Sequence, residues 1–163
     1  MGQLTNLIES IVVGASAPGG GVHGEYRGTG AFDLYFSTGF YGRVSESELE
    51  RRLEQVARLL WTGFTRRKRA VHDELGIHEL DDDPGRDRVF YDERERIVAA
   101  GASDDGRISV SVEGMCQWRV VVTDGTVRTL AERDFLAGLG TAARRLVEDQ
   151  SRQIMELRER VYA

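Results

Sequence analysis

The sequence predicts an α+β protein in which antiparallel β-sheet units are each followed by a long helix. Three observations predict this fold class. Aromatic and β-branched residues alternate with polar residues in two separate stretches, one in each half of the chain. A run of apolar residues at helical spacing follows each stretch. At each joint, a Ser or Thr precedes a Glu by three residues, which is the pattern of a helix-capping box.

Residues 1–78 form the first predicted unit. Apolar residues recur at helical spacing over Gln3–Val13, which predicts a short amphipathic helix, and "GASAPGGG" at Gly14–Gly21 is interpreted as a connector. The stretches "VHGEYRG" and "AFDLYFSTGFYGRV" predict two or three antiparallel strands, with turns near Gly28–Gly30 and Gly39.

The first long helix is predicted from Glu46 to Leu75. Ser45 and Glu48 form the capping box at its start, because the Ser oxygen can accept the backbone N–H of the Glu. Gly76 is placed to end the helix.

An acidic Pro-Gly linker, "ELDDDPGRDR", is predicted at residues 79–88, and residues 89–163 form the second predicted unit. Val89–Tyr91 and Arg96–Ala100 are interpreted as pieces of strand.

Two further strands and a second long helix are predicted in this unit. Apolar residues alternate with polar ones over Ile108–Val112, and the pattern resumes over Trp118–Val122 after Gly114. A capping box of Thr129 and Glu132 then introduces the helix. The predicted core of the whole chain is Leu49, Leu53, Val56, Leu60, Ile108, Val110, Val120, Val122, Leu136, Leu139 and Leu146.

The two halves resemble each other around "GRVSESE" and "GTVRTLAE", if one residue is shifted. An internal duplication would explain this resemblance, and so would the general pattern of strand-to-helix junctions. A three-stranded sheet with one helix has a small core, which favours burial of its open face against a second copy of the same unit.

Composition predicts a cytoplasmic protein. The chain is 40% hydrophobic and 30% charged, and its single cysteine, Cys116, permits no disulfide within the chain. No apolar run approaches the roughly 20 residues of a membrane span. The formal net charge of −5 argues mildly against a strongly electrostatic nucleic-acid binder, although a local basic face can act within an acidic protein.

No catalytic or metal-binding pattern is found. His72 and His78 are six residues apart rather than the four that place two ligands on one helix face, and the Asp81–Asp83 run with Asp87 has no EF-hand spacing. No arrangement of Ser, His and Asp or of paired carboxylates can be proposed from spacing. We therefore expect a non-enzyme with no cofactor, no metal and no small-molecule substrate.

The basic cluster Arg66, Arg67, Lys68 and Arg69 is the candidate nucleic-acid-binding site. The functional interpretation is that these residues contact phosphates, which would give weak, salt-dependent and sequence-tolerant binding. The alternative is a solvated, ion-paired helix face, because Glu46–Gly76 carries six acidic residues beside its seven basic ones.

The run "IVAAGASDDGRISVSVEGMCQWRVVVTDGTV" with "FLAGLGTAARRLVEDQSRQIMEL" resembles the YbaB/EbfC family of nucleoid-associated proteins. The resemblance spans roughly residues 45–160 and implies a homodimeric or pseudo-dimeric unit, with DNA binding in some members. Unlike that family, this chain has a strand-rich segment before its first long helix and lacks a Met-rich opening helix. The family has no fixed set of DNA-contacting residues to transfer.

The stretch "GRVSESELERRLEQVARLLWTGFTRRKRA" is similar to accessory proteins of type VII (ESX) secretion. Two function hypotheses follow. The first is a non-catalytic, nucleoid-associated DNA binder that pairs with itself or a related chain. The second is a protein-interaction or chaperone-like accessory protein, in which a helix face or a strand edge binds the partner.

Overall fold

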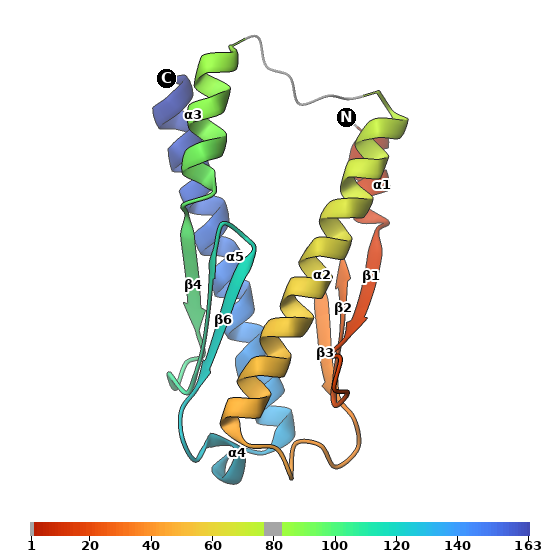
Figure 1. Ribbon diagram of the computed structural model, residues 1–163, viewed down its shortest axis with the longest axis vertical. Helices are drawn as coiled ribbons and strands as arrows, with labels where there is room; N and C mark the ends of the chain where they lie inside the picture. The colour runs from red at the N-terminus through yellow and green to blue at the C-terminus, as the bar shows by residue number, and fades with distance from the viewer. Residues whose placement is uncertain (1, 77–82) are drawn as a thin grey trace. The chain divides into compact units, whose positions relative to one another are not determined.

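Each half of the chain forms a three-stranded antiparallel sheet followed by a long helix, which confirms the predicted α+β class (Figure 1). The computed structural model describes residues 2–76 and 83–163. The chain divides into two units, the first comprising Met1–Val44 and Arg51–Glu79, the second Ser45–Glu50 and Leu80–Ala163.

The first unit contains a short helix, a sheet with strand order β1-β2-β3, and most of the first long helix. Its elements are α1 (Gly2–Glu9), β1 (Val12–Ser16), β2 (Val22–Arg27), β3 (Phe32–Phe36) and α2 (Glu46–Glu74). The stretches in which two or three strands were predicted from aromatic and β-branched residues contain two, β2 and β3.

The first predicted helix is too long at its C-terminal end. The observed helix α1 ends at Glu9, and the apolar residues that follow belong to the sheet. The Gly28 N–H donates to the Ile11 carbonyl (2.9 Å), and Val13 is buried in β1. The predicted connector is also partly wrong, because its residues Gly14–Ser16 complete β1. Alternating and helical spacing coincide over so short an apolar run, and the sheet pairing decides between them.

The first long helix agrees with the prediction. It spans Glu46–Glu74, and the Glu48 N–H donates to the Ser45 hydroxyl oxygen (3.2 Å) as the capping box requires. Gly76 follows the helix with a φ of +66°, in the left-handed region that favours glycine.

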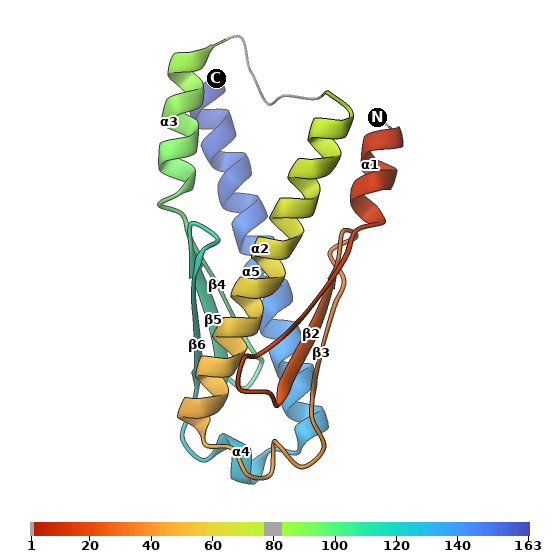
Figure 2. The same ribbon diagram turned by 45° about the vertical axis from the view of Figure 1, so that its right-hand side comes forward.

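The second unit repeats this plan with one additional short helix. Its elements are α3 (Pro84–Arg94), β4 (Val98–Ala102), β5 (Ile108–Glu113), β6 (Gln117–Val122), α4 (Thr126–Thr129) and α5 (Glu132–Tyr162). The strand order is β4-β5-β6, and α5 packs on β4 and β5 while α3 lies beside the C-terminal part of α5 (Figure 2).

The predicted strand at Val89–Tyr91 is wrong, because these residues lie within α3. The Asp83 carboxylate accepts the Arg86 N–H (3.2 Å) and Pro84 occupies the first turn, so an Asp-Pro pair begins the helix. Phe90 is the buried anchor, with its ring 5.7 Å from that of Tyr162. Of the predicted linker, residues 79–82 lie outside the described residues.

The predicted capping box at the second long helix is also wrong. Thr129 ends α4, where its hydroxyl donates to the Gly125 carbonyl (2.9 Å), and α5 begins after Ala131 without a side-chain cap. The predicted core is buried except for Leu136, which is half-buried, because its neighbour Phe135 takes the fully buried position.

The two halves correspond at a constant separation of 86 residues, as from Val12 to Val98 at the start of β1 and β4 and from Glu46 to Glu132 at the start of α2 and α5. Strand registers shift by the same amount, and so do the loop hydrogen bonds: Gly28 N–H to Ile11 carbonyl matches Gly114 N–H to Ile97 carbonyl. The residue shift assumed in the sequence comparison is therefore wrong, because Gly39 corresponds to Gly125.

Few side chains are shared between the repeats, but glycines recur where the backbone requires them. A Cβ at Gly28 would collide with the Ile8 carbonyl, and one at Gly114 would lie 2.6 Å from the Glu95 carbonyl oxygen. The repeat is thus conserved in backbone geometry and turns rather than in most of its side chains.

Candidate nucleic-acid interface

The four basic residues predicted from the sequence occupy one turn of α2, and all four are exposed. Their contacts with the sheet differ. The Arg67 guanidinium donates to the Val12 carbonyl of β1 (2.6 Å), so it also attaches the helix to the edge of the sheet. Arg66, Lys68 and Arg69 make no such contact with the sheet in the described part of the chain.

A longer basic stretch of α2 surrounds this cluster. From Gln55 to His72 the helix carries Arg58 and the four clustered residues but no Asp or Glu. At 1.5 Å per residue this stretch is about 27 Å long. The acidic residues of α2 lie outside this stretch. Glu54 comes immediately before it and Asp73 immediately after it.

The packing of α2 on its sheet determines which side of the helix carries this charge. Val56 and Leu60 are buried, and both lie beside Gly24 of β2. At 100° per residue, Arg58 and Arg69 fall on the opposite side of the helix, with Arg66 and Lys68 on its two flanks. Sequence reasoning identified the cluster but missed Arg58, which the burial pattern of the helix adds.

The charges on this face are not neutralised within the described residues. Arg58, Arg66, Lys68 and Arg69 form no ion pair or hydrogen bond there, in contrast to five arginines of the second unit. Arg86, Arg107, Arg145, Arg152 and Arg160 each form an ion pair with a carboxylate of that unit.

Because the two units are repeats, the ion pairing of corresponding arginines can be compared directly. Arg152 is the counterpart of Arg66, and it lies between Asp149 (2.5 Å) and Glu156 (2.9 Å). The hydrogen bonds that Arg152 donates to Asp149 and then to Glu156 raise the pKa of Arg152 above its usual value. In the first unit the positions of these two carboxylates are taken by Gly63 and Ala70. The same helix position therefore carries a paired arginine in one repeat and an unpaired arginine in the other.

A second polar cluster, missed in the sequence, lies on the sheet of the first unit. The two ring nitrogens of His23 are hydrogen-bonded to the Ser16 hydroxyl (2.7 Å) and the Ser37 hydroxyl (2.8 Å), and the ring stacks on Tyr35 at 5.1 Å. Strand alternation places Ser16, His23 and Tyr35 in one row across β1, β2 and β3, so the register was the signal that could have found it.

The other sequence candidates have local structural roles. Asp83 caps α3, Asp87 accepts a hydrogen bond from the Tyr162 hydroxyl, and Cys116 is a free, exposed thiol. His78, Asp81 and Asp82 lie outside the described residues. Across residues 2–76 and 83–163, no three His, Cys, Asp or Glu side chains are grouped so that they could hold a metal ion.

Comparison with known proteins assigns no family to the chain. No protein-family model matches it, and neither a curated protein nor a solved structure matches it. Within the described residues, no helix combines the length and the apolar character needed to cross a membrane.

Proposed function

We propose that the protein is a non-catalytic, nucleoid-associated nucleic-acid binder in which the basic face of α2 contacts the phosphate backbone. One observation carries the proposal: from Gln55 to His72 the helix carries five basic residues and no acidic one. Four of these five, Arg58, Arg66, Lys68 and Arg69, have no partner among the described residues. Their charge is therefore available to an external anion.

This arrangement supports binding to the backbone rather than to the bases. Arg and Lys are the usual phosphate ligands, and contacts of this kind orient a protein on DNA without reading its sequence. The cluster itself contains no aromatic side chain on which a base could stack. The overall charge of −5 opposes association, so we expect weak binding that depends steeply on salt.

The test is fluorescence anisotropy with a labelled random-sequence duplex over a range of salt concentrations. Each lost phosphate contact lowers the slope of log K against log salt by about 0.9. The triple variant Arg66→Ala, Lys68→Ala, Arg69→Ala is therefore expected to lower the slope by about 3 and to bind at least about tenfold more weakly at low salt.

The repeat supplies the matched control. The triple variant Arg145→Ala, Arg152→Ala, Arg160→Ala removes the same amount of charge from α5, but from arginines that are already ion-paired, and we expect it to bind as the unchanged protein does. No binding at low salt, or equal losses in the two triple variants, would contradict the proposal. Basic residues near a helix C-terminus also stabilise the helix, so far-UV circular dichroism of both variants must show retained helix content.

A protein-interaction function is the second candidate, and the exposed sheet faces favour it. Tyr35 is 57% exposed on the first sheet, and Val98 and Val121 are 54% and 41% exposed on the second. A type VII secretion accessory protein would use such a face to hold its client. A partner that is recovered by the unchanged protein and lost with Tyr35→Asp or Val121→Asp would support this function, and recovery unaffected by both changes would contradict it.

A further inference from the structure

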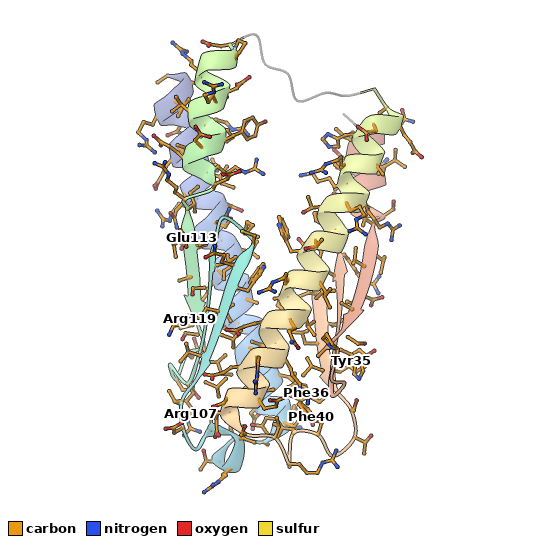
Figure 3. The ribbon with its side chains drawn as sticks, viewed as in Figure 1. Tyr35, Phe36, Phe40, Arg107, Glu113 and Arg119 are labelled. Atoms are coloured by element: carbon orange, nitrogen blue, oxygen red, sulfur yellow. The ribbon has the colours of Figure 1, made fainter. Side chains whose placement is uncertain are left out.

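Each sheet has one face that packs against its long helix and one outer face. In the first unit, Val22 and Phe36 are buried while Asp33 and Tyr35 alternate with them and are exposed. In the second unit the same alternation buries its core residues and exposes an outer row. Tyr35 on the first sheet and Arg107, Glu113 and Arg119 on the second can be followed in Figure 3.

The two outer faces carry opposite charges at corresponding positions. At a separation of 86 residues, Asp33 of β3 corresponds to Arg119 of β6, and Arg27 of β2 corresponds to Glu113 of β5. Arg27 is paired with Glu25 of its own strand (3.2 Å). Asp33 and Arg119 are both exposed, and neither has an ion-pair or hydrogen-bond partner among the described residues.

The side chains in the row next to these charges also differ in size between the two outer faces. On the first sheet the row is Ser16, His23 and Tyr35, in which the two rings stack and Tyr35 is exposed. On the second sheet the corresponding row is Ala102, Ser109 and Val121. Small side chains there leave room for a ring above the sheet.

We propose that these outer faces form an interface between two copies of the chain, in which the first sheet of one copy packs on the second sheet of another. Asp33 then faces Arg119, and Tyr35 covers the small-residue row. Two identical sheets packed face to face about a two-fold axis would place like charges together near the axis. Inverted charge at corresponding positions replaces that repulsion with attraction, which favours pairing of unlike sheets.

The experiment is sedimentation velocity of the full chain over a range of concentrations, with charge-reversal variants. We expect the unchanged protein to associate with rising concentration, and Asp33→Arg and Arg119→Asp each to weaken association by about tenfold or more, because each places like charges in the interface. The double variant carries both reversals and is expected to associate again.

Mixing gives the sharpest outcome. Asp33→Arg protein and Arg119→Asp protein, each impaired alone, should form a complex together, because the arginine introduced in one copy then meets the aspartate introduced in the other. The controls Asp92→Arg and Arg88→Asp make the same charge changes on exposed positions of α3 and should leave association unchanged. A protein that stays monomeric at every concentration, or association insensitive to both reversals, overturns the proposal; circular dichroism excludes misfolding as the cause.

Discussion

The two repeats share one backbone plan but fit the helix to the sheet in different ways. In the first unit, Gly24 leaves room for Val56 and Leu60 of α2, since a Cβ there would lie 3.0 Å from a methyl carbon of each. The corresponding residue of the second unit is Val110, which is itself buried. There the close approach occurs at Gly101 instead, where a Cβ would collide with the Ala142 carbonyl and lie 2.5 Å from the Leu146 nitrogen.

A second pair of positions shows the same exchange. Gly63 of α2 faces Val13 of β1, and a Cβ at Gly63 would lie 2.7 Å from a Val13 methyl carbon. The corresponding pair in the second unit is Asp149 and Ala99. A large residue on the strand is thus matched by glycine on the helix in one repeat, and the sizes are reversed in the other. Because protein interiors are close-packed, volume lost at one position must be supplied at its neighbour.

Turns and strand register are the same in the two repeats, while core volume is distributed differently. Gly20 and Gly106 have φ values of +80° and +73°, and Gly39 and Gly125 have +80° and +85°. Only glycine adopts these conformations without strain, so these corresponding positions keep the residue. Interior positions need only sum to the same volume, so their identities diverge.

The largest expected effect tests the close approach of α5 to Gly101 of β4. Gly101→Ala places a Cβ against the backbone of α5, and backbone cannot move aside as a flexible side chain can. We expect the free energy of unfolding to fall by about 3 kcal/mol. Urea denaturation followed by Trp118 fluorescence, in a Trp61→Phe background, would measure this in the second unit.

Gly140→Ala is the control for the glycine substitution at position 101. Gly140 lies within α5 with no atom within 4 Å of a Cβ built there, so alanine should raise stability by up to about 1 kcal/mol. If Gly101→Ala were as well tolerated as Gly140→Ala, α5 would not approach β4 as closely as described.

The Ala99–Asp149 pair of the second unit can be placed at the corresponding positions of the first unit, Val13 and Gly63. Gly63→Asp alone should destabilise the first unit by about 2 kcal/mol through collision with Val13. Val13→Ala alone should cost about 1–2 kcal/mol through lost burial. The double variant reproduces the Ala99–Asp149 pair, and we expect it to be at least about 1 kcal/mol more stable than the sum of the single effects.

Urea denaturation followed by Trp61 fluorescence, in a Trp118→Phe background, would measure the cycle. Additive effects would show that the two positions do not compensate each other. Coupling of the opposite sign would show that the aspartate is tolerated only in the setting of the second unit.

Most strands and both long helices could be predicted from the sequence because their patterns are long. The spacing over Glu46–Glu74 and the capping of Ser45 left little ambiguity. The helix α3 could not be predicted from spacing because Val89–Tyr91 is a short apolar run. The helix depends instead on Asp83, Pro84 and the packing of Phe90 against Tyr162 of α5. The 86-residue repeat was obscured because corresponding core residues differ in size.

The candidate interface was only partly accessible to sequence reasoning. The run of basic residues at 66–69 is visible in the letters, but their ionic partners are not. Arg66 and Arg152 look alike in sequence, and only the structure shows that Asp149 and Glu156 neutralise the second one. The charge inversion between Asp33 and Arg119 required the register of both sheets before the two positions could be compared.

The smallest expected effect on stability concerns the edge strand β4. Side chains of α5 make more hydrogen bonds to the backbone of β4 than side chains of α2 make to that of β1. The Asp149 carboxylate accepts the Ala100 N–H (3.0 Å), and Gln153 donates to the Val98 carbonyl (2.9 Å). In the first unit Arg67 bonds the corresponding Val12 carbonyl, but Gly63 offers no carboxylate for the Gly14 N–H. Acid should therefore weaken an edge contact in the second unit that the first unit does not have.

The direction of this pH effect on stability follows from the hydrogen bonds that shift the pKa of Asp149. The hydrogen bond from the Ala100 N–H, then the bond from Arg152, lowers the pKa of Asp149 below its usual value. The carboxylate therefore stabilises the folded unit fully above the unfolded-state pKa of about 3.9, and this contribution is lost as the pH falls through the lower folded-state pKa. Asp149→Asn should lower the urea midpoint at pH 7 and flatten its decline between about pH 5 and pH 3.

The exposed neighbour Glu148, which has no hydrogen bond or ion pair among the described residues, provides the control as Glu148→Gln. Glu46 and Asp105 also have lowered pKa values, through backbone hydrogen bonds first, so an acid-dependent loss of stability should remain in every variant. Only the part due to Asp149 should disappear. If Asp149→Asn and Glu148→Gln gave the same pH profile, the carboxylate would not hold the edge of β4, and the difference in edge capping between the repeats would have no energetic consequence.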